Sequence, residues 1–257
     1  MDAARGEGSA FACGASRPIP GRPASLDRMN RSEEAIAILG GTGDQGLGLA
    51  LRFAKAGRQV VIGSRKLGRA EAAAKHVLGV VPEARVSGCE NAEATRDAPI
   101  VILSVPFEHS AGTLKEIRSS LTAGQIVVSM AVPLATAIGD GAVRTLGIWQ
   151  GSCAQLLDSL APEGIAVVSA FQNVSAHRLQ ALDQPVECDV IVSGPQPARG
   201  TVMGLCELVP GLRAVNGGPL ANARVVEEIT ALLIGLNVRY KVPEGLGIRL
   251  TGLPQDG

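Results

Sequence analysis

Residues 36–46 read Ile36-Ala37-Ile38-Leu39-Gly40-Gly41-Thr42-Gly43-Asp44-Gln45-Gly46, an apolar run followed by glycines in the spacing G-x-G-x-x-G. The run predicts a β-strand, and the amphipathic stretch at 46–56 predicts a helix directly after it. Such a turn places the positive N-terminal end of a helix where the phosphates of a dinucleotide bind. Gly41 would allow the tight turn, Gly43 the approach of the pyrophosphate, and Gly46 close packing of the helix on the strand. The stretch predicts a Rossmann-type dinucleotide-binding unit, and the alternative is a purely structural glycine turn.

The end of the next predicted strand, at 59–62, indicates which dinucleotide binds. An acidic residue about 20 positions after the glycines would bind the ribose 2′-hydroxyl of NAD and repel the 2′-phosphate of NADP. That place holds Gly63, Ser64 and Arg65, followed by Lys66. A hydroxyl, a guanidinium and an ammonium suit a dianionic phosphate. NADP is therefore expected rather than NAD, and a solvated turn with ordinary surface side chains is the alternative.

Short apolar runs alternate with amphipathic stretches from residue 35 onward, which is typical of parallel strands joined by helices. We expect an α/β fold, a Rossmann-type doubly wound and mostly parallel sheet with a small C-terminal lobe. Strands are predicted at 35–39, 59–62, 100–105, 125–129 and 164–169, with a weaker one near 85–87, and helices at 46–56, 69–78, 110–121 and 152–160.

Three segments are expected along the chain. Residues 1–33 lack apolar periodicity and predict a disordered extension or a mis-assigned start, with Met29 just before the first strand. Residues 34–170 form the predicted NADP-binding domain. Residues 171–257 form the predicted lobe, with strands at 189–193 and 212–215. A helix at 219–241 would carry the apolar residues Val225, Ile229, Leu232, Leu233 and Leu236.

The composition excludes several function classes. The 257 residues hold 24 Lys+Arg and 24 Asp+Glu, so no surplus charge favours nucleic acid or an anionic membrane. Aromatic residues are only 2% of the chain, which argues against base stacking. The apolar runs are too short for a span of about 20 residues. The five cysteines form no CxxC pair, so we expect no metal site and a cytoplasmic location.

No catalytic triad or metal cluster is apparent, and the one tyrosine, Tyr240, has Glu244 rather than a lysine four positions on. Hydride transfer between two flat rings needs mainly face-to-face alignment in a dry slot. The segments expected around such a slot follow the strands, at the carboxyl edge of the sheet. They are 104–109, 130–133 and 169–173. His109 would contact a phosphate or ribose, or have only a structural role at a helix start.

These residues resemble the NADPH-dependent reductases of coenzyme F420, an 8-hydroxy-5-deazaflavin. The similarity runs from residue 35 to 248, through the segments LGGTGDQG at 39–46, GSR at 63–65, SVPFEH at 104–109, SAFQNVSA at 169–176 and GGPLANAR at 217–224. The resemblance implies hydride transfer between NADPH and the deazaflavin. The two small-molecule cofactors would stack between the Rossmann domain and the C-terminal lobe, commonly in a homodimer.

The resemblance also implies the cofactor-binding residues. The NADP-binding motif matches Thr42, Asp44, Gln45, Ser64 and Arg65, together with the glycines above. The loop beneath the cofactor matches Ser104, Val105, Pro106 and His109, and the neighbourhood of the deazaflavin matches Ala131, Val132, Phe171, Gln172, Asn173, Gly218, Pro219 and Leu220.

Two other functions stay open from the residues alone. One is a catalytically silent NADP(H)-sensing module, because Gly40, Gly43 and Gly46 also fit a G-x-x-G-x-x-G spacing. The other is an NADPH reductase of flavin or another planar acceptor, which a dry slot would also admit. An imine or β-hydroxyacid reductase would need a lysine after the fourth strand, and Lys115 falls too early for that role.

Overall fold

A computed structural model of the chain describes residues 35–253, so the expectation for residues 1–33 lies outside the described part. Six strands form one parallel sheet in the order β3-β2-β1-β4-β5-β6. This order confirms the expected doubly wound α/β fold, because the chain reverses direction across the sheet between β1 and β4. The strands are β1 (Ile36–Leu39), β2 (Val60–Ser64), β3 (Val86–Glu90), β4 (Ile100–Leu103), β5 (Ile126–Ser129) and β6 (Ala166–Ser169).

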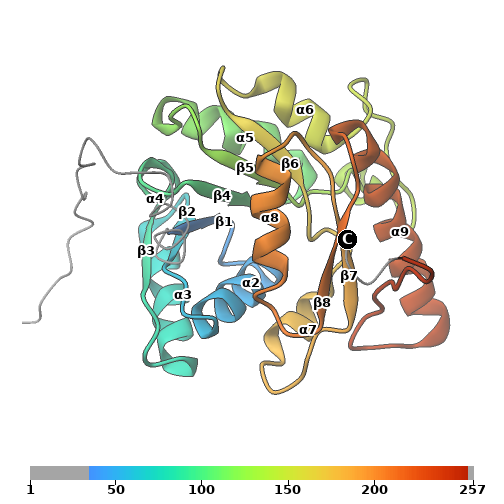
Figure 1. Cartoon of the computed structure of the whole chain (residues 1–257), viewed down its shortest axis with the longest axis horizontal. Helices are drawn as coiled ribbons and strands as arrows, with labels where there is room; N and C mark the ends of the chain where they lie inside the picture. The colour runs from blue at the N-terminus through green and yellow to red at the C-terminus, as the bar shows by residue number, and fades with distance from the viewer. Residues whose placement is uncertain (1–34, 254–257) are drawn as a thin grey trace, which may run out of the picture. The chain divides into compact units, whose positions relative to one another are not determined.

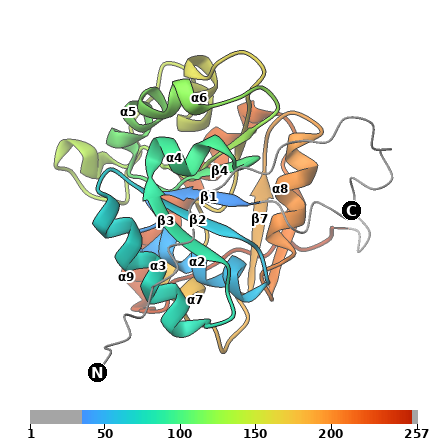
Figure 2. The same cartoon turned by 90° about the vertical axis from the view of Figure 1, so that its left-hand side faces the viewer.

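Both faces of this sheet are covered, which explains why its strands are continuously apolar. In β1, Ile36 and Ile38 face the core beneath α2 (Asp44–Lys55), whereas Ala37 and Leu39 face the core beneath α5 (Phe107–Ile117). Figures 1 and 2 show α2 and α3 (Leu67–Val80) on one face of the sheet. The other face carries α4 (Asn91–Arg96), α5 and α6 (Cys153–Leu160).

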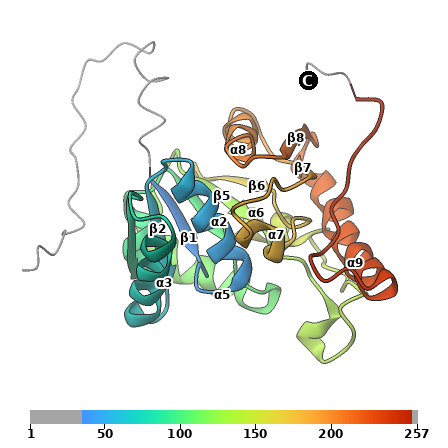
Figure 3. The same cartoon turned by 90° about the horizontal axis from the view of Figure 1, so that it is seen from below.

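The C-terminal part contains a second, two-stranded parallel sheet of β7 (Cys188–Val192) and β8 (Leu212–Asn216). The helix α8 (Ala198–Cys206) connects the two strands and lies beside them in Figure 3. Sequence reasoning missed α8, because Gly200 and Gly204 lower its intrinsic helix propensity. The helix forms because Val202 and Leu205 are buried in the same core as the main sheet.

A buried arginine joins α2 to the segment that follows β6. Arg52 is only 3% exposed, and its guanidinium donates to four backbone carbonyls in and after the short helix α7 (Ala176–Gln180). Burial lowers the pKa of Arg52, although nearby Asp183 opposes this shift. Because one guanidinium supplies partners for carbonyls between Arg178 and Gln184, it holds this segment, which has little regular structure of its own.

The last helix, α9 (Ala223–Tyr240), is apolar on two faces. Its inner face buries Val226, Ala231 and Leu233. Its outer face leaves Val225 53% and Leu232 59% exposed. Of the five apolar residues expected along this helix, Leu233 alone is buried, so the sequence pattern located the helix and not its inward face.

Candidate functional site

The glycine turn joins β1 to α2 as predicted, with one change in the role of its glycines. The positive φ belongs to Gly40 (80°) rather than to Gly41, so Gly40 makes the tight turn. A Cβ at Gly46 would lie 2.7 Å from the carbonyl oxygen of Gly40 and 2.8 Å from the Cα of Gly41. Gly46 therefore lets the first turn of α2 pack directly on the loop, and not on the strand.

The N-terminus of α2 is open to a ligand. Gly43 occupies the N-cap position and provides no side-chain cap, and Thr42 to Asp44 are exposed. The first N–H groups of a helix have no partner inside the helix, and the helix dipole adds positive potential there. This end of α2 can therefore bind phosphate oxygens through its backbone.

The predicted phosphate-binding residues stand beside this turn. Gly63 pairs with Leu39 in the sheet, and its carbonyl accepts from Gly40 N at 3.1 Å, so the end of β2 adjoins the glycine loop. Ser64 is nearly buried, whereas Arg65 is exposed. The first turn of α3, which follows, contains no acidic residue. The local charge thus suits a 2′-phosphate.

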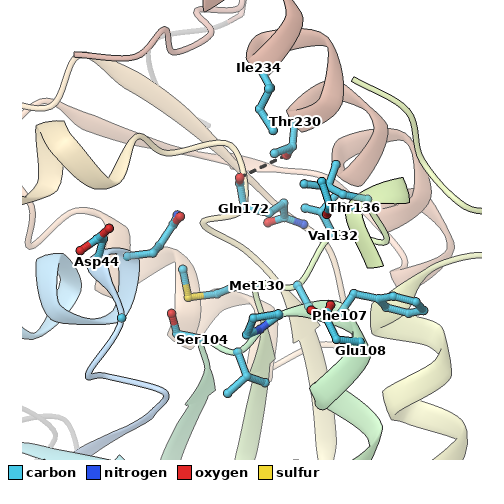
Figure 4. Close-up of a pocket in the computed structure, with 16 residues that line it drawn as sticks. Asp44, Ser104, Phe107, Glu108, Met130, Val132, Thr136, Gln172, Thr230 and Ile234 are labelled. Carbon is cyan, nitrogen blue, oxygen red and sulfur yellow. Dashed lines mark hydrogen bonds between the residues drawn. The ribbon is translucent and has the colours of Figure 1, made fainter. Parts of the chain in front are cut away.

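A pocket of about 500 Å³ opens at the carboxyl ends of β1, β4, β5 and β6 (Figure 4). It lies at the point where the sheet order reverses, which is where ligands bind in open α/β folds. Its walls are largely apolar or small, which suits a flat ring system. The lining residues are Gly43, Asp44, Gln45, Ser104, Val105, Pro106, Phe107, Glu108, Met130, Ala131, Val132, Leu134, Thr136, Gln172, Thr230 and Ile234.

Gln172 forms a polar point in this wall. Its side-chain Nε2 donates to Ser169 Oγ, and its backbone oxygen accepts from Thr230 Oγ1 at 3.1 Å, the dashed line in Figure 4. Its Oε1 is buried and has no hydrogen-bond partner among the described residues. A buried acceptor without a partner favours a ligand that brings an N–H or O–H group.

Gln45 connects the two sides of the pocket. Its Nε2 donates to the carbonyl oxygens of Phe171 at 3.1 Å and Val174 at 2.9 Å. The loop at the start of α2 is thereby held to the turn that carries Gln172. Phe171 itself adopts a positive φ of 68° and packs edge-on against Phe53 of α2.

The structure places the predicted site residues in three groups. Gly41, Thr42, Gly46, Ser64 and Arg65 lie in or beside the glycine turn, outside the pocket lining. Gly43, Asp44, Gln45, Ser104, Val105, Pro106, Ala131, Val132 and Gln172 line the pocket. The remaining residues, His109, Phe171, Asn173, Gly218, Pro219 and Leu220, stand outside that lining.

Two members of the last group are committed to the protein interior. The Phe171 ring is fully buried, and the Asn173 amide donates to the backbone oxygen of Asp189 at 2.8 Å. Sequence reasoning missed Thr136 and two residues of α9, Thr230 and Ile234. The last two lie four positions apart on one face of a helix, but many apolar pairs in α9 share that spacing.

The pocket offers little side-chain acid or base chemistry, since Asp44 and Glu108 are its only ionisable residues among those described. Within residues 35–253, no group of three or more His, Cys, Asp and Glu residues is placed to hold a metal ion. No helix in the described part is long and apolar enough to cross a membrane. Together, the parallel sheet, the glycine turn and the pocket at the reversal of strand order define a Rossmann-type dinucleotide-binding protein.

Comparison with known proteins narrows this class. The family model described as NADP oxidoreductase, coenzyme F420-dependent, matches residues 35–133. The F420-dependent NADP reductase of Methanocaldococcus jannaschii is 48% identical over 223 residues, which cover 85% of this chain and 98% of the relative. That of Methanothermobacter marburgensis is 42% identical over 224 residues, covering 86% and 99%. The chain belongs to the family of F420-dependent NADP reductases.

A solved structure supports the fold. The crystal structure of a putative F420-dependent NADP reductase from Arthrobacter sp. FB24 superposes with a TM-score of 0.69 at 23% identity. The superposed region covers 84% of this chain and 99% of the Arthrobacter chain. The fold therefore extends over nearly all of the described residues.

Proposed function

We propose that this protein transfers a hydride between NADPH and coenzyme F420, an 8-hydroxy-5-deazaflavin. In the reducing direction, NADPH, oxidised F420 and one proton give NADP⁺ and reduced F420. The observation that supports this most directly is the apolar pocket, which begins at the glycine loop and ends at Gln172 and α9. Relatives of this chain at 42% and 48% identity carry the name of that reaction.

On the NADP side, the residues around the turn fit the cofactor. The N-terminus of α2 would bind the pyrophosphate, because no side chain caps its first N–H groups. Gly46 keeps this end of the helix close to the loop, since a Cβ there would collide with Gly40 and Gly41. Ser64 and Arg65 would bind the 2′-phosphate. The loop at Ser104, Val105 and Pro106 would support the nicotinamide end in the pocket.

On the acceptor side, the residues exclude water and align a second ring. Ala131 and Val132 line the pocket, and their short side chains would leave room for a flat ring beside them. Gln172 offers Oε1 to a donor on the ring edge. The barrier to hydride transfer falls when two rings are held face to face in a dry pocket. The acceptor side would also include residues in the turns beside the pocket, namely Asn173, Gly218, Pro219 and Leu220.

The alternatives fit the chain less well. A silent NADP(H)-sensing module has no need of a second ring site, whereas this pocket extends beyond the glycine loop to α9. Membership of a reductase family also favours an enzyme. Reduction of a flavin in place of the deazaflavin remains the second candidate, because the pocket walls would admit either ring.

A homodimer in the cytoplasm completes the proposal. The exposed apolar side chains of α9 support a dimer, since Val225 and Leu232 on its outer face and Val238 and Tyr240 near its C-terminal end are each more than half exposed. The buried thiols Cys153, Cys188 and Cys206 support a reducing compartment. We further propose that residues 34–170 bind NADP and that 171–257 complete the acceptor site.

One assay tests the activity. Purified protein with NADPH should bleach the visible absorbance of oxidised F420, and NADH should be a poor substitute. FMN and riboflavin serve as competing acceptors in parallel reactions. A folded protein that binds NADPH but transfers hydride to none of these acceptors would refute the reductase and favour the sensing module.

A further inference from the structure

The buried carboxylate of Glu227, on α9, caps the N-terminus of α6. Glu227 lies on α9 and is only 2% exposed. Its Oε2 accepts from the backbone N of Cys153 at 2.8 Å, and its Oε1 accepts from that of Ala154 at 3.1 Å. These are the first two residues of α6. A carboxylate at a helix N-terminus is favoured by the free N–H groups and by the helix dipole.

The next N–H groups of α6 already have hydrogen-bond partners in the residue that precedes the helix. Ser152 caps the helix, because its Oγ accepts from Gln155 N at 3.0 Å and its carbonyl accepts from Leu156 N at 3.0 Å. The N–H groups of Cys153 and Ala154 are thus the two that α6 cannot satisfy itself. The carboxylate of Glu227 completes the cap from another helix, 73 positions along the chain from Ala154.

The same face of α9 continues into the pocket. Thr230 and Ile234 follow Glu227 at intervals of three and four residues, so the three side chains share one face. Thr230 and Ile234 line the pocket, and Thr230 also donates to the backbone oxygen of Gln172. The hydrogen bonds from the N-terminus of α6 to Glu227 therefore help to set where Thr230 and Ile234 stand in the pocket wall.

Apolar packing alone would not fix that position. Apart from Glu227 and the Thr230 hydroxyl, which donates to the Gln172 backbone oxygen at 3.1 Å, the buried side chains of this face are small or aliphatic, namely Ala223, Val226, Ala231 and Leu233. Hydrophobic contacts are non-directional and tolerate small rotations and shifts of a helix. Two hydrogen bonds to a carboxylate have strict distances and angles.

We propose that Glu227 is a positioning residue of the enzyme, which holds α9 in register so that Thr230 and Ile234 form the acceptor wall of the pocket. This inference rests on the proposed function, because it concerns how the second ring is bound. Glu227 does not line the pocket and is not a catalytic residue.

The hydrogen bonds of Glu227 to α6 should depend on pH, because they require its carboxylate to be charged. Burial raises the pKa of Glu227 to about 7, and the two amide hydrogen bonds oppose that rise without cancelling it. Glu228, on the same helix, raises it further. On the α6 side the facing group is the Cys153 thiol, which burial keeps neutral by raising its pKa to about 12. Protonation would turn one acceptor oxygen of Glu227 into a donor and break one of the two bonds.

The test compares Glu227→Gln with the wild-type enzyme in steady-state assays from pH 6 to 8.5. An amide presents one oxygen and one NH₂ group, so it can satisfy only one of the two N–H groups. The KM for F420 should rise roughly tenfold, as for loss of one charge-assisted hydrogen bond, while the Kd for NADPH stays unchanged. The wild-type KM for F420 should also rise as the pH falls through about 7. The Glu227→Gln variant should not show this rise in KM near pH 7. Ionisation of the substrates affects both enzymes equally, so it does not contribute to the difference between their pH profiles.

Glu228→Gln is the matched control, since Glu228 is the next residue and is exposed. It should leave the KM for F420 unchanged at high pH and move the step to lower pH, because it removes a charge that raises the pKa of Glu227. Should Glu227→Gln fail to fold, Glu227→Asp takes its place: it keeps the charge and is shorter by one methylene, so the KM for F420 should again rise, whereas the pH step should persist.

Hydrogen exchange separates this inference from the proposed function. Faster amide exchange in α9 and at Cys153 and Ala154 of α6, with the rest of the described chain unchanged, supports the anchor, even if neither enzyme reduces F420 and the proposed function fails. Equal exchange in α9 together with equal KM values and equal pH profiles would overturn the role of Glu227.

Discussion

Gln45 donates a 3.1 Å hydrogen bond from its side-chain amide to the backbone oxygen of Phe171, which joins the glycine loop to the turn after β6. A second bond from the same nitrogen reaches Val174 at 2.9 Å. The sequence places Gln45 in an NADP-binding motif, whereas the structure shows that its amide is already engaged by protein. We therefore expect an indirect contribution of Gln45 to binding, through the distance between the two sides of the pocket.

Gln45→Met should keep the volume of the side chain and remove both bonds. Each net hydrogen bond contributes about 1 kcal/mol, so we expect a loss of about 1–2 kcal/mol in the free energy of unfolding. The rate of hydride transfer should fall more than the affinity for NADPH, because the rings lose alignment. Single-turnover kinetics with NADPH deuterated at C4 would measure this. Equal losses in rate and affinity would instead make Gln45 a direct NADP ligand.

Arg65→Ala should weaken NADPH binding by about 1–3 kcal/mol, which is the contribution of a charge-assisted contact to phosphate. NADH lacks the 2′-phosphate, so its affinity should be unaffected. Fluorescence titration of both nucleotides measures the ratio. Arg118→Ala, at another exposed arginine outside the site, is the control and should alter neither affinity.

Ala131→Trp should fill the pocket next to the rings. Ala131 lines the pocket, and the residue before it, Met130, lines it too, so the neighbouring wall leaves little space for an indole. Turnover with F420 should be abolished while the affinity for the adenosine end of NADP is kept. Binding of 2′,5′-ADP by calorimetry measures the second quantity. Parallel loss of both would contradict the separation of the nucleotide and acceptor sides.

Asp189→Asn should destabilise the C-terminal part of the chain. Asp189 is fully buried and accepts two hydrogen bonds from Arg213, one from Arg249 and one from the backbone N of Leu250. Removing one partner of a buried ion pair costs about 3–5 kcal/mol. Because both arginines are partly exposed, we expect the lower end of that range in urea unfolding at pH 7. Glu187→Gln, which removes an exposed ion pair to Arg249, should cost much less.

The same carboxylate predicts a pH dependence of stability. Burial alone would raise the pKa of Asp189, but the bonds from Arg213, the Leu250 amide and Arg249 outweigh it and lower the pKa to about 2. A carboxyl group with a depressed pKa stabilises the fold above its unfolded value of 3.8, and this contribution is lost as the pH falls from there towards about 2. The wild-type protein should lose stability in that window, and Asp189→Asn should not show this component.

Leu232→Glu should disrupt the proposed dimer. Leu232 is 59% exposed on the outer face of α9, so the substitution leaves the inner packing of the helix intact. A charge buried in an apolar interface without a partner is strongly unfavourable. Sedimentation velocity should then report a monomer where the wild type is a dimer. A wild-type protein that sediments as a monomer would refute the dimer itself.

Local sequence determined a large part of this protein. The apolar strands with β-branched residues, the glycines that follow β1 and the Ser64-Arg65 pair after β2 lie within 30 positions of one another, and their spacing is meaningful only in a Rossmann unit. Parallel pairing of β1 with β2 then puts those two segments side by side. The six strands, the fold class and the expectation of NADP followed from such short-range patterns.

Tertiary structure decided what long-range packing controls. Nothing near Thr230, Ile234 or Glu227 in the sequence indicates that α9 turns them towards a pocket and a helix end formed many residues earlier, since the helix is apolar on two faces. Likewise Gly40 is required by Ser104, which belongs to the loop after another strand and whose backbone oxygen leaves no room for a Cβ there. A periodic pattern reports that a helix forms, but which face meets the core depends on surfaces that only the folded chain brings together.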